Sequence, residues 1–375
     1  MPSRERFGLP RRRNRYNPGQ VAKVIVGMSG GVDSSVTAAL LKQAGHDVIG
    51  VTLNVWPDLP NMPEVQRADA CCALGAVEDA RRVADKLDIP YYVLNFREVF
   101  EDRVIKDFVQ TYASGRTPNP CIRCNQFIKF DALLVKARQL GAGYVATGHY
   151  ARIEHGHPNR LRKAADPAKD QSYVLYVMSQ DRLGAAMMPL GDYTKSSTRQ
   201  LATDLDLSVA NKPESQDICF VPFKRYTEFI ELYAPEVLQP GPIVDQAGRV
   251  LGEHRGVALH TIGQRRGLGV SAGEPLFVTA LEPTTSTVVV GGPEALLKSS
   301  CRLEEVNWID GEPPSEPLRA MGKARYRSQE VACTVRRDGS DLVVDFDAPQ
   351  KALTPGQALV LYDGEYVLGG GTISR

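Results

Sequence analysis

The chain has 375 residues, of which 43% are hydrophobic and 24% are charged. This composition is ordinary for a globular protein, and the length allows two or three domains. Lys and Arg outnumber Asp and Glu by 45 to 44, and so small a net charge excludes binding of nucleic acid through overall positive charge. The sequence has no apolar run of the ~18 residues needed to cross a membrane, and its start lacks the apolar region of a signal peptide. We therefore expect a cytoplasmic protein with no membrane partner.

Residues 1–20 are polar and rich in arginine, so we expect a loose basic N-terminal extension there. The apolar run 21–26 predicts a buried strand, residues 36–42 are compatible with a helix, and residues 48–55 predict a second strand; together they make a βαβ unit. The alternation continues with a helix at 72–87, a strand at 91–96, a helix at 130–140 and a strand at 144–147. This order predicts an α/β fold with a doubly wound parallel sheet.

A glycine-rich turn, residues 27–35, joins the first strand to the first helix. Its paired glycines let backbone N–H groups approach an anion, and the helix N-terminus favours negative charge. We expect Asp33 or Ser34 to cap the helix. Neither the Walker pattern nor Gly-x-Gly-x-x-Gly is present, which excludes those two nucleotide-binding motifs here.

The alternative is a tight turn that binds no ligand. However, a strand, then Ser-Gly-Gly-x-Asp-Ser, then a helix resembles the loop of N-type ATP pyrophosphatases. That resemblance implies cleavage of ATP between its α- and β-phosphates, with the following residues around the pyrophosphate: Ser29, Gly30, Gly31, Asp33 and Ser34.

The pattern changes after residue 222. Glycines and short alternating runs at 248–251, 259–268, 277–281 and 287–290 predict a small β-rich central domain. In the last eighty residues, Asp338-Gly339 and Asp363-Gly364 are two-residue turn signals between alternating segments, which predict β-hairpins in an antiparallel barrel or sandwich. We therefore divide the chain into an extension at 1–20, a catalytic domain at 21–222, a central domain at 223–296 and a C-terminal barrel domain at 297–375.

Seven cysteines at irregular spacing do not make a disulfide scaffold in a chain of this length. Cys301 and Cys333 lie in strand-like runs, where we expect inert core residues. Cys71 and Cys72 begin a predicted helix and are also expected to pack. Because these two are adjacent, they are poorly placed to complete a four-thiolate zinc site with other cysteines.

Cys121, Cys124 and Cys219 instead lie in loops that contain prolines or charges. A thiolate nucleophile needs positive charge nearby, which Arg123 and Lys212 are expected to supply. A redox or metal pair is the alternative for Cys121 and Cys124. An adenylating site together with two cysteine loops indicates exchange of oxygen for sulfur. In such a reaction ATP converts an oxygen into a leaving group, and a persulfide sulfur then displaces AMP. A second thiol releases the sulfur from its carrier.

Several motifs occur in order across residues 21–375: residues 27–35, Thr117-Pro-Asn-Pro120, Cys124-Asn125, Ala146-Thr-Gly-His-Tyr150, Lys169-Asp-Gln171, residues 214–220, residues 260–267 and Lys323-Ala-Arg-Tyr326. Together they resemble the tRNA-specific 2-thiouridylase (MnmA) family. The resemblance implies ATP-dependent, Mg²⁺-assisted thiolation of the C2 oxygen of wobble uridine in tRNAs for Lys, Glu and Gln, with recognition of the anticodon arm and sulfur from a relay protein or cysteine desulfurase.

The resemblance also implies roles for individual residues. Those at the ATP site would be Gly27, Met28, Ser29, Gly30, Gly31, Val32, Asp33, Ser34, Leu53 and Gly148, with Leu53 near the adenine. The loop that meets the target base would contain Asn119, Pro120 and Cys121. Cys219 would carry the persulfide, and Cys124 would form a transient disulfide with it as sulfur leaves. The residues that touch tRNA would be Lys169, Asp170, Gln171, Arg325 and Tyr326.

One position departs from the family pattern, since many members carry an aspartate where this chain has Cys121. A thiol does not replace a carboxylate as an acceptor or Mg²⁺ ligand. Three cysteines, Cys121, Cys124 and Cys219, would then surround one site, and a second hypothesis is that they bind a [4Fe–4S] cluster whose open iron holds the incoming sulfide. The persulfide and cluster routes both stay open at this point.

Proteins of other classes share some of these features. An amidotransferase-type synthetase would use the same ATP loop, but no glutaminase motif is found in the sequence. A nucleotide-binding protein without catalytic activity would not need the cysteine loops, and a sulfur-relay protein would not need an ATP site. A 4-thiouridine synthetase is the nearest enzymatic alternative and would be expected to carry a separate RNA-binding module. Taken alone, the basic clusters along the chain are more typical of a solvated surface than of an RNA-binding patch.

Overall fold

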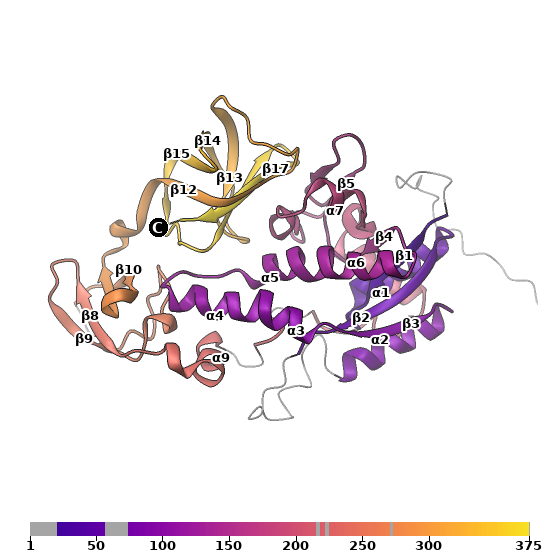
Figure 1. Cartoon of the computed structure of the whole chain (residues 1–375), viewed down its shortest axis with the longest axis horizontal. Coiled ribbons are helices and arrows are strands. Elements are labelled where there is room, and N and C mark those ends of the chain that lie inside the picture. Colours follow the sequence, from indigo (N-terminus) through magenta and orange to yellow (C-terminus); the bar gives the residue numbers. More distant parts are fainter. Residues whose placement is uncertain (1–20, 57–73, 215–217, 222–224, 271–272, 375) are drawn as a thin grey trace, which may run out of the picture.

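The computed structural model describes residues 21–56, 74–214, 218–221, 225–270 and 273–374. The first part of the chain contains a five-stranded parallel sheet, whose strands run in colour from indigo through purple to rose in Figure 1. Its strands, in spatial order, are β3 (Tyr91–Asn95), β2 (Asp47–Asn54), β1 (Lys23–Gly27), β4 (Tyr144–Ala146) and β7 (Ala186–Met187). The order confirms the predicted doubly wound sheet, because the chain moves to one edge and then returns past β1 to the other.

Helices cover both faces of this sheet, which explains its almost continuous apolar strands. Val24 and Val26 of β1 pack with α1, α2 and α8, whereas Ile25 between them packs with α6 on the opposite face. The α-helices of this part are α1 (Val32–Gln43), α2 (Leu74–Lys86), α3 (Arg97–Phe100), α4 (Lys106–Ala113), α5 (Pro120–Arg123), α6 (Leu133–Gln139), α7 (Gln180–Gly184) and α8 (Lys195–Asp204).

Other helical turns complete this part of the chain. Two π-helical segments, η2 (Glu101–Ile105) and η3 (Cys124–Ala132), continue directly into α4 and α6, so the predicted helix at 130–140 is the end of a longer helical run that starts at α5. Short 3₁₀ turns are η4 (Ser172–Leu175) and η5 (Pro189–Asp192). None of the helices in the described segments is both long and apolar enough to cross a membrane.

The central part contains helix α9 (Tyr226–Tyr233) and a four-stranded sheet with the spatial order β10 (Phe277–Glu282), β11 (Thr287–Gly291), β8 (Gly241–Asp245) and β9 (Val250–His254). Its 3₁₀ turns are η6 (Pro235–Val237), η7 (Val257–Leu259), η8 (Pro283–Thr285) and η9 (Pro293–Leu296). The predicted β-rich character is therefore confirmed. The alternating run 259–268 is not a strand, however, because its two glycines, Gly263 and Gly267, turn the backbone at positive φ, as does Gly269 directly after it.

The C-terminal part is an antiparallel barrel, drawn in orange and yellow in Figure 1. Its strands are β12 (Leu297–Trp308), β15 (Asp341–Lys351), β14 (Val331–Asp338), β13 (Leu318–Lys323), β16 (Ala358–Asp363) and β17 (Tyr366–Ile373), and the pairing of β12 with β17 closes it. Both predicted two-residue turns are present, with Gly339 and Gly364 at positive φ. The prediction of an antiparallel barrel is confirmed.

The barrel also packs directly on the first part of the chain. Leu359 and Leu361 of β16 point into the barrel core, while Val360 and Tyr362 between them pack against η4. A hairpin from the first part, β5 (Arg152–Glu154) and β6 (Arg160–Arg162), extends the barrel sheet by pairing with β17. Because successive side chains of a strand point to opposite faces, one face of β16 packs in the barrel core and the other packs against the first part of the chain.

Candidate functional site

The glycine-rich turn lies at the carboxyl end of β1, where parallel sheets place their ligands. Met28 donates its backbone N–H to Val51 O at 2.8 Å, and Thr52 Oγ1 donates to Met28 O at 2.6 Å, so the turn is tied to β2. Gly30 has φ +67°, and a Cβ there would lie 2.1 Å from Ala76 O. Glycine is therefore required at position 30 both for its conformation and for the close approach of α2.

The start of α1 differs from the predicted cap. Gly31 is the N-cap residue, and no side chain caps it, so the prediction that Asp33 or Ser34 would do so is wrong. Ser34 Oγ instead accepts from Ser29 N at 3.1 Å and donates to Gly31 O at 3.2 Å, which closes the turn on itself. No side chain caps α1, and the positive end of its dipole lies at the loop, an arrangement that favours a phosphate group.

A lysine from a distant helix lies at the first turn of α1. Lys195 Nζ donates to both carboxylate oxygens of Asp33, at 2.7 and 2.8 Å, and Tyr150 donates its hydroxyl to the same carboxylate at 2.8 Å. Only 12% of the Lys195 side chain is exposed. Burial, followed by the charge of Asp33, raises the pKa of Tyr150, so this hydroxyl stays protonated and donates.

The sequence analysis did not identify Lys195 as a residue of the site. Thr194 caps α8 by accepting from Ser197 N, which makes Lys195 the first residue of that helix. A cation is unfavourable at a helix N-terminus, where the dipole is positive. A lysine directly after a capping threonine was thus a usable signal for a nearby anion.

Two further groups tie the turn to later segments. Lys212 Nζ donates to Gly30 O at 3.0 Å and to Asp79 at 2.8 Å, so it lies at the turn, a contact that the sequence analysis did not predict. Glu214 accepts from Lys169 at 2.6 Å and lies 3.3 Å from Lys195 Nζ. The hydrogen bond from Lys169, together with the charge of Lys195, lowers the pKa of the Glu214 carboxyl.

Gly148 and Leu53 also lie at this edge of the sheet. A Cβ on Gly148 would lie 2.9 Å from both Asp33 C and Ser34 N, so the loop after β4 touches the backbone of the turn. Leu53 is half-buried near the end of β2. The residues predicted for ATP binding are therefore brought together from β1, β2 and β4, on the edge where the carboxyl ends of these strands meet.

The loop predicted to meet the target base leads into α5. Asn119 caps this helix, Pro120 is its first residue and is buried, and Cys121 is exposed. Burial raises the pKa of Tyr326 in the barrel, and the nearby charges of Asp170 and Cys121 raise it further. Cys121 and the ring of Tyr326 are thus both exposed to solvent.

Cys124 and Cys219 are both half-buried, and both pack against the apolar cluster that contains Phe108 and Phe220. The fold thus brings Cys124 and Cys219 to one cluster, although they are far apart in the sequence. The prediction that Cys121 and Cys124 lie in a loop is wrong, because Cys121 lies in α5 and Cys124 begins η3. The guanidinium of Arg123 is engaged elsewhere, at 3.3 Å from Asp107 and 2.6 Å from Glu305. Its charge is therefore balanced by carboxylates, whereas we expected it to act on Cys124.

A shared metal site is not formed by these cysteines in the structure. Across the described residues, no three His, Cys, Asp or Glu side chains are grouped so that they could hold a metal ion. Cys121, Cys124 and Cys219 are all described, so in this arrangement they do not fit a [4Fe–4S] cluster, and no reaction step is derived through one.

The barrel cysteines behave as core residues, as predicted. Cys333 is fully buried and Cys301 is half-buried. Burial raises the pKa of Cys301 to about 12 and that of Cys333 to about 11, so both stay protonated at neutral pH and are unsuited to nucleophilic chemistry. The prediction for Cys71 and Cys72 lies outside the described residues.

Family models match three consecutive parts of the chain. The tRNA methyl transferase HUP domain matches residues 22–223, the tRNA methyl transferase PRC-barrel domain matches residues 227–292, and the aminomethyltransferase beta-barrel domain matches residues 298–373. The tRNA-specific 2-thiouridylase MnmA of Heliobacterium modesticaldum is 51% identical over 94% of this chain and 92% of its own length. That of Lachnoclostridium phytofermentans is 48% identical over 94% of this chain and 99% of its own.

The chain belongs to the tRNA-specific 2-thiouridylase family. The predicted family is thus confirmed. Among solved structures, a 4-thiouridine synthetase–RNA complex with bound ATP overlaps at a TM-score of 0.33 with 17% identity, covering 58% of this chain and 51% of that one. An overlap this low carries no argument about the reaction.

The residues that the family pattern assigns to tRNA have defined partners within the protein. Asp170 accepts from Ala164 N at 2.9 Å and from the Ser172 hydroxyl at 2.8 Å, and Gln171 accepts from Tyr150 N at 2.9 Å. Arg325 donates to the backbone oxygen atoms of Lys351 and Ala352. Tyr326 is 39% exposed. Asp170, Gln171 and Arg325 therefore shape their loops, while Tyr326 presents a ring to solvent.

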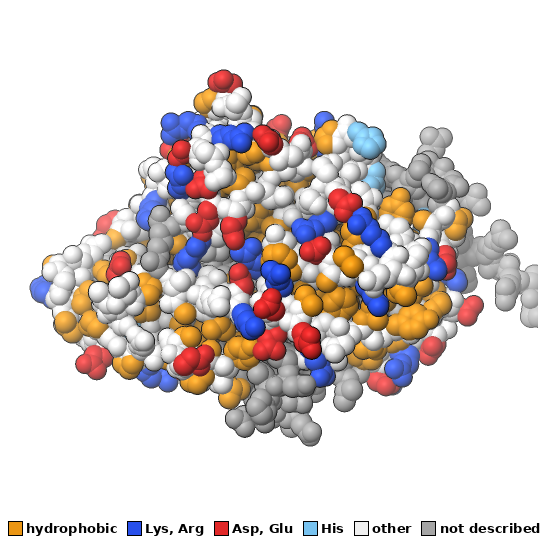
Figure 2. Space-filling view, viewed as in Figure 1, with side chains coloured by type: hydrophobic (Ala, Val, Ile, Leu, Met, Phe, Trp, Pro, Cys, Tyr) orange, Lys and Arg blue, Asp and Glu red, His pale blue; other side chains and the backbone are white. Residues whose placement is uncertain are grey.

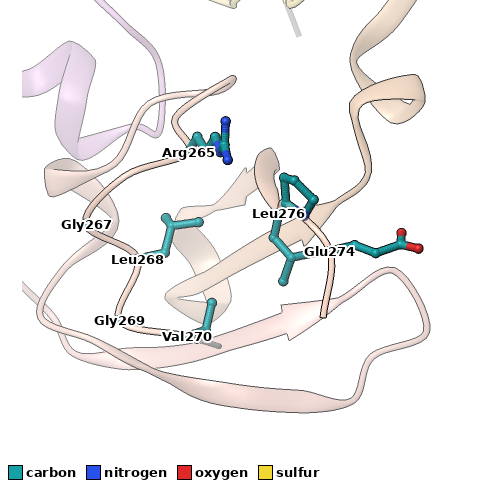
Figure 3. Close-up of a pocket in the computed structure, with 8 residues that line it drawn as sticks. Arg265, Gly267, Leu268, Gly269, Val270, Glu274 and Leu276 are labelled. Carbon is teal, nitrogen blue, oxygen red and sulfur yellow. The ribbon is translucent and has the colours of Figure 1, made fainter. Parts of the chain in front are cut away.

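The family motif at 260–267 lies in the central part, beside a cavity of about 280 Å³ shown in Figure 3. Leu268, Val270 and Leu276 line it, and Arg265 lies at its rim. Gln264 holds the loop by accepting from Thr261 N at 3.1 Å and donating to Arg266 O at 3.0 Å. This motif is therefore a structured loop away from the glycine-rich turn.

Proposed function

We propose that this protein catalyses the ATP-dependent 2-thiolation of wobble uridine in tRNAs for Lys, Glu and Gln, reading the anticodon arm. The observation that carries the proposal is membership of the tRNA-specific 2-thiouridylase family over nearly the whole chain. The arrangement of the turn, the target-base loop and the two cysteine loops is consistent with each step.

ATP is proposed to place its phosphates on the turn, against the dipole of α1 and the paired glycines. The adenine would lie beside Leu53, and Gly148 would allow the nucleotide close to the backbone. The ammonium groups of Lys195 and Lys212 both contact residues of the turn. Protein sites typically hold Mg²⁺ through one or two carboxylates and the substrate phosphates. We propose that Mg²⁺ would neutralise phosphate charge here and that Asp33, which Lys195 and Tyr150 bind in this structure, would be its carboxylate.

In the first step, the C2 oxygen of the uridine attacks the α-phosphorus of ATP. The bond between the α- and β-phosphates breaks, pyrophosphate leaves, and the base becomes adenylated at that oxygen. Lys195 supports this step because a cation beside the turn stabilises the charge that develops on the departing pyrophosphate. Asn119, Pro120 and Cys121 are proposed to hold the base.

In the second step, the terminal sulfur of a Cys219 persulfide loses its proton and attacks C2, and the C2–O bond breaks to release AMP. The Cys124 thiolate then attacks Cys219 Sγ, the sulfur–sulfur bond to the base breaks, and 2-thiouridine leaves. The product on the protein is a disulfide between Cys124 and Cys219, and a dithiol reductant restores both thiols. The common apolar cluster against which both cysteines pack supports their meeting.

The partners follow from this chemistry. A cysteine desulfurase or relay protein would deliver the sulfane sulfur to Cys219. The proposed tRNA contacts are Lys169, Asp170, Gln171, Arg325 and Tyr326, of which Tyr326 is the exposed ring. We also propose a cytoplasmic location.

The test combines two assays on the full chain with tRNA, ATP and a desulfurase. Nucleoside chromatography of the digested tRNA separates 2-thiouridine from 4-thiouridine, and ATP–pyrophosphate exchange measures adenylation. We expect tRNA-dependent exchange and 2-thiouridine from wild type. Cys219→Ser and Cys124→Ser should abolish thiolation and keep exchange, whereas Cys301→Ser in the barrel should keep both. Exchange without tRNA, or 4-thiouridine as the product, would refute the proposal.

A further inference from the structure

The connection between α4 and α5 runs along the C-terminal barrel (Figure 1). Thr117 donates its N–H to Pro355 O at 2.8 Å. The side-chain amide of Gln357 donates to Thr117 O at 3.1 Å and to Pro118 O at 3.0 Å. A single barrel side chain thus binds two consecutive carbonyl groups, 240 and 239 residues away in sequence, directly before Asn119.

The approach of the barrel to this loop is close. Gly356 has φ +90°, and a Cβ there would lie 2.8 Å from both the N and the O atom of Thr117. The barrel turn therefore needs a glycine at position 356, because a side chain would push the backbone of the loop away.

Ion pairs anchor the loop on both sides. Before it, Arg116 pairs with Glu304 of β12. After it, Arg123 lies 2.6 Å from Glu305, whose carboxylate also accepts from the Thr372 hydroxyl at 3.0 Å. Figure 2 shows basic and acidic side chains intermixed on the face where the barrel meets α4 and α5. Residues 119–121 lie between these two anchors.

The loop has few backbone N–H groups that could form hydrogen bonds within it. Pro118 and Pro120 lack an N–H, so the loop offers few donors of its own. Ile122 of α5 packs in the same apolar cluster as Ala358 and Val360 of β16. Contacts with the barrel therefore supply hydrogen bonds and packing that the loop does not make within itself.

We propose that the C-terminal barrel positions the target-base loop and that Gln357 is the positioning residue. This inference rests on the proposed function, in which Asn119, Pro120 and Cys121 meet the uridine. Gln357 acts through the carbonyl groups of Thr117 and Pro118 and does not touch the base. A shift of about 1 Å in such a loop costs up to about 100-fold in rate, because the reacting atoms lose their alignment.

The test is the isosteric variant Gln357→Glu, which replaces the amide donor by an acceptor facing two carbonyl oxygens. Gln350→Glu is the matched control, because the Gln350 amide bonds to Ala348 O within its own strand β15. We expect Gln357→Glu to lower kcat for 2-thiouridine formation at least 10-fold, with KM for ATP and the thermal midpoint close to wild type. Gly356→Ala should reproduce the fall in kcat, and Gln350→Glu should match wild type.

Hydrogen exchange gives a second readout that does not depend on the reaction. Amide exchange across residues 114–123 should be faster in Gln357→Glu than in wild type and Gln350→Glu. If wild type forms no 2-thiouridine, the proposed function fails, and the exchange data still decide whether the barrel holds the loop. Wild-type kcat and exchange in Gln357→Glu would overturn the inference. Equal losses of thermal midpoint, ATP binding and kcat would also overturn it, since they indicate general stabilisation.

Discussion

Lys195 Nζ lies 2.7 and 2.8 Å from the two carboxylate oxygens of Asp33, although 162 residues separate them in sequence. The pair joins the first turn of α8 to the first turn of α1, so two helix N-termini meet at the glycine-rich turn. A lysine held there by a carboxylate is positioned before any phosphate group arrives. Preorganised charge of this kind accelerates reactions because it needs no rearrangement at the moment of bond cleavage.

Replacing Lys195 by glutamine should therefore impair adenylation. We expect Lys195→Gln to lower tRNA-dependent ATP–pyrophosphate exchange by about 100-fold, the usual effect of removing one such donor. Lys42→Gln is the control, because Lys42 lies at the other end of α1 and donates to Asp88 O. Exchange at the wild-type rate in Lys195→Gln would show that the lysine only balances the charge of Asp33.

Gly148 should not tolerate a side chain. Its Cβ would lie 2.9 Å from backbone atoms of Asp33 and Ser34, so Gly148→Ala must displace the start of α1. We expect ATP affinity, measured by calorimetry, to fall at least 10-fold. At Gly143 a Cβ would meet nothing within 4 Å, so Gly143→Ala should bind ATP as wild type does. Equal affinities in the two variants would mean that ATP does not use this edge of the sheet.

The stability of the protein should fall in mild acid because of a buried histidine in the central part. Burial lowers the pKa of His260 from 6.5 to about 4, and the charge of His254 adds to this. The unfolded chain then binds a proton that the folded chain does not, so stability is lost as pH falls from about 6.5 to about 4, by roughly 3 kcal/mol at most.

Urea unfolding followed by circular dichroism at pH 7 and pH 4.5 measures this effect. His260→Gln should show a smaller loss between the two pH values than wild type. The matched control is His157→Gln, at an exposed position, which should lose as much stability as wild type. The same loss in wild type and His260→Gln would contradict the assignment.

The cysteine at position 121 gives a test of the sulfur route. Because the three cysteines are not grouped as ligands, we expect iron-free protein to form 2-thiouridine when supplied with a desulfurase. Cys121→Asp should then be active under air as well as without oxygen. Activity that follows iron content in wild type and becomes independent of iron in Cys121→Asp would instead establish the cluster route.

The domain architecture could be read from sequence because its signals are local. Strand-like segments that alternate with helix-like segments predicted the parallel sheet. Short runs of alternating residues predicted the strands of the barrel, and Asp-Gly pairs predicted two of its turns. The glycine-rich turn was recognisable for the same reason, since Gly30 is needed for a backbone conformation that involves only its neighbours. Cys333 could likewise be placed in the core from the pattern of its own strand.

Contacts between distant segments could not be read in this way. Lys212 precedes the Cys219 loop in sequence, yet it lies on Gly30, and Arg123 adjoins Cys124, yet it pairs with Asp107 and Glu305. Long flexible side chains reach whichever partner the fold brings near them, and no periodicity records that choice. The sequence by itself therefore determined the family, the fold class and the glycine-rich turn. Only the tertiary structure decided that Lys195 and Lys212 lie at that turn and that Gln357 of the barrel binds the backbone directly before Asn119, because these contacts join segments far apart in the sequence.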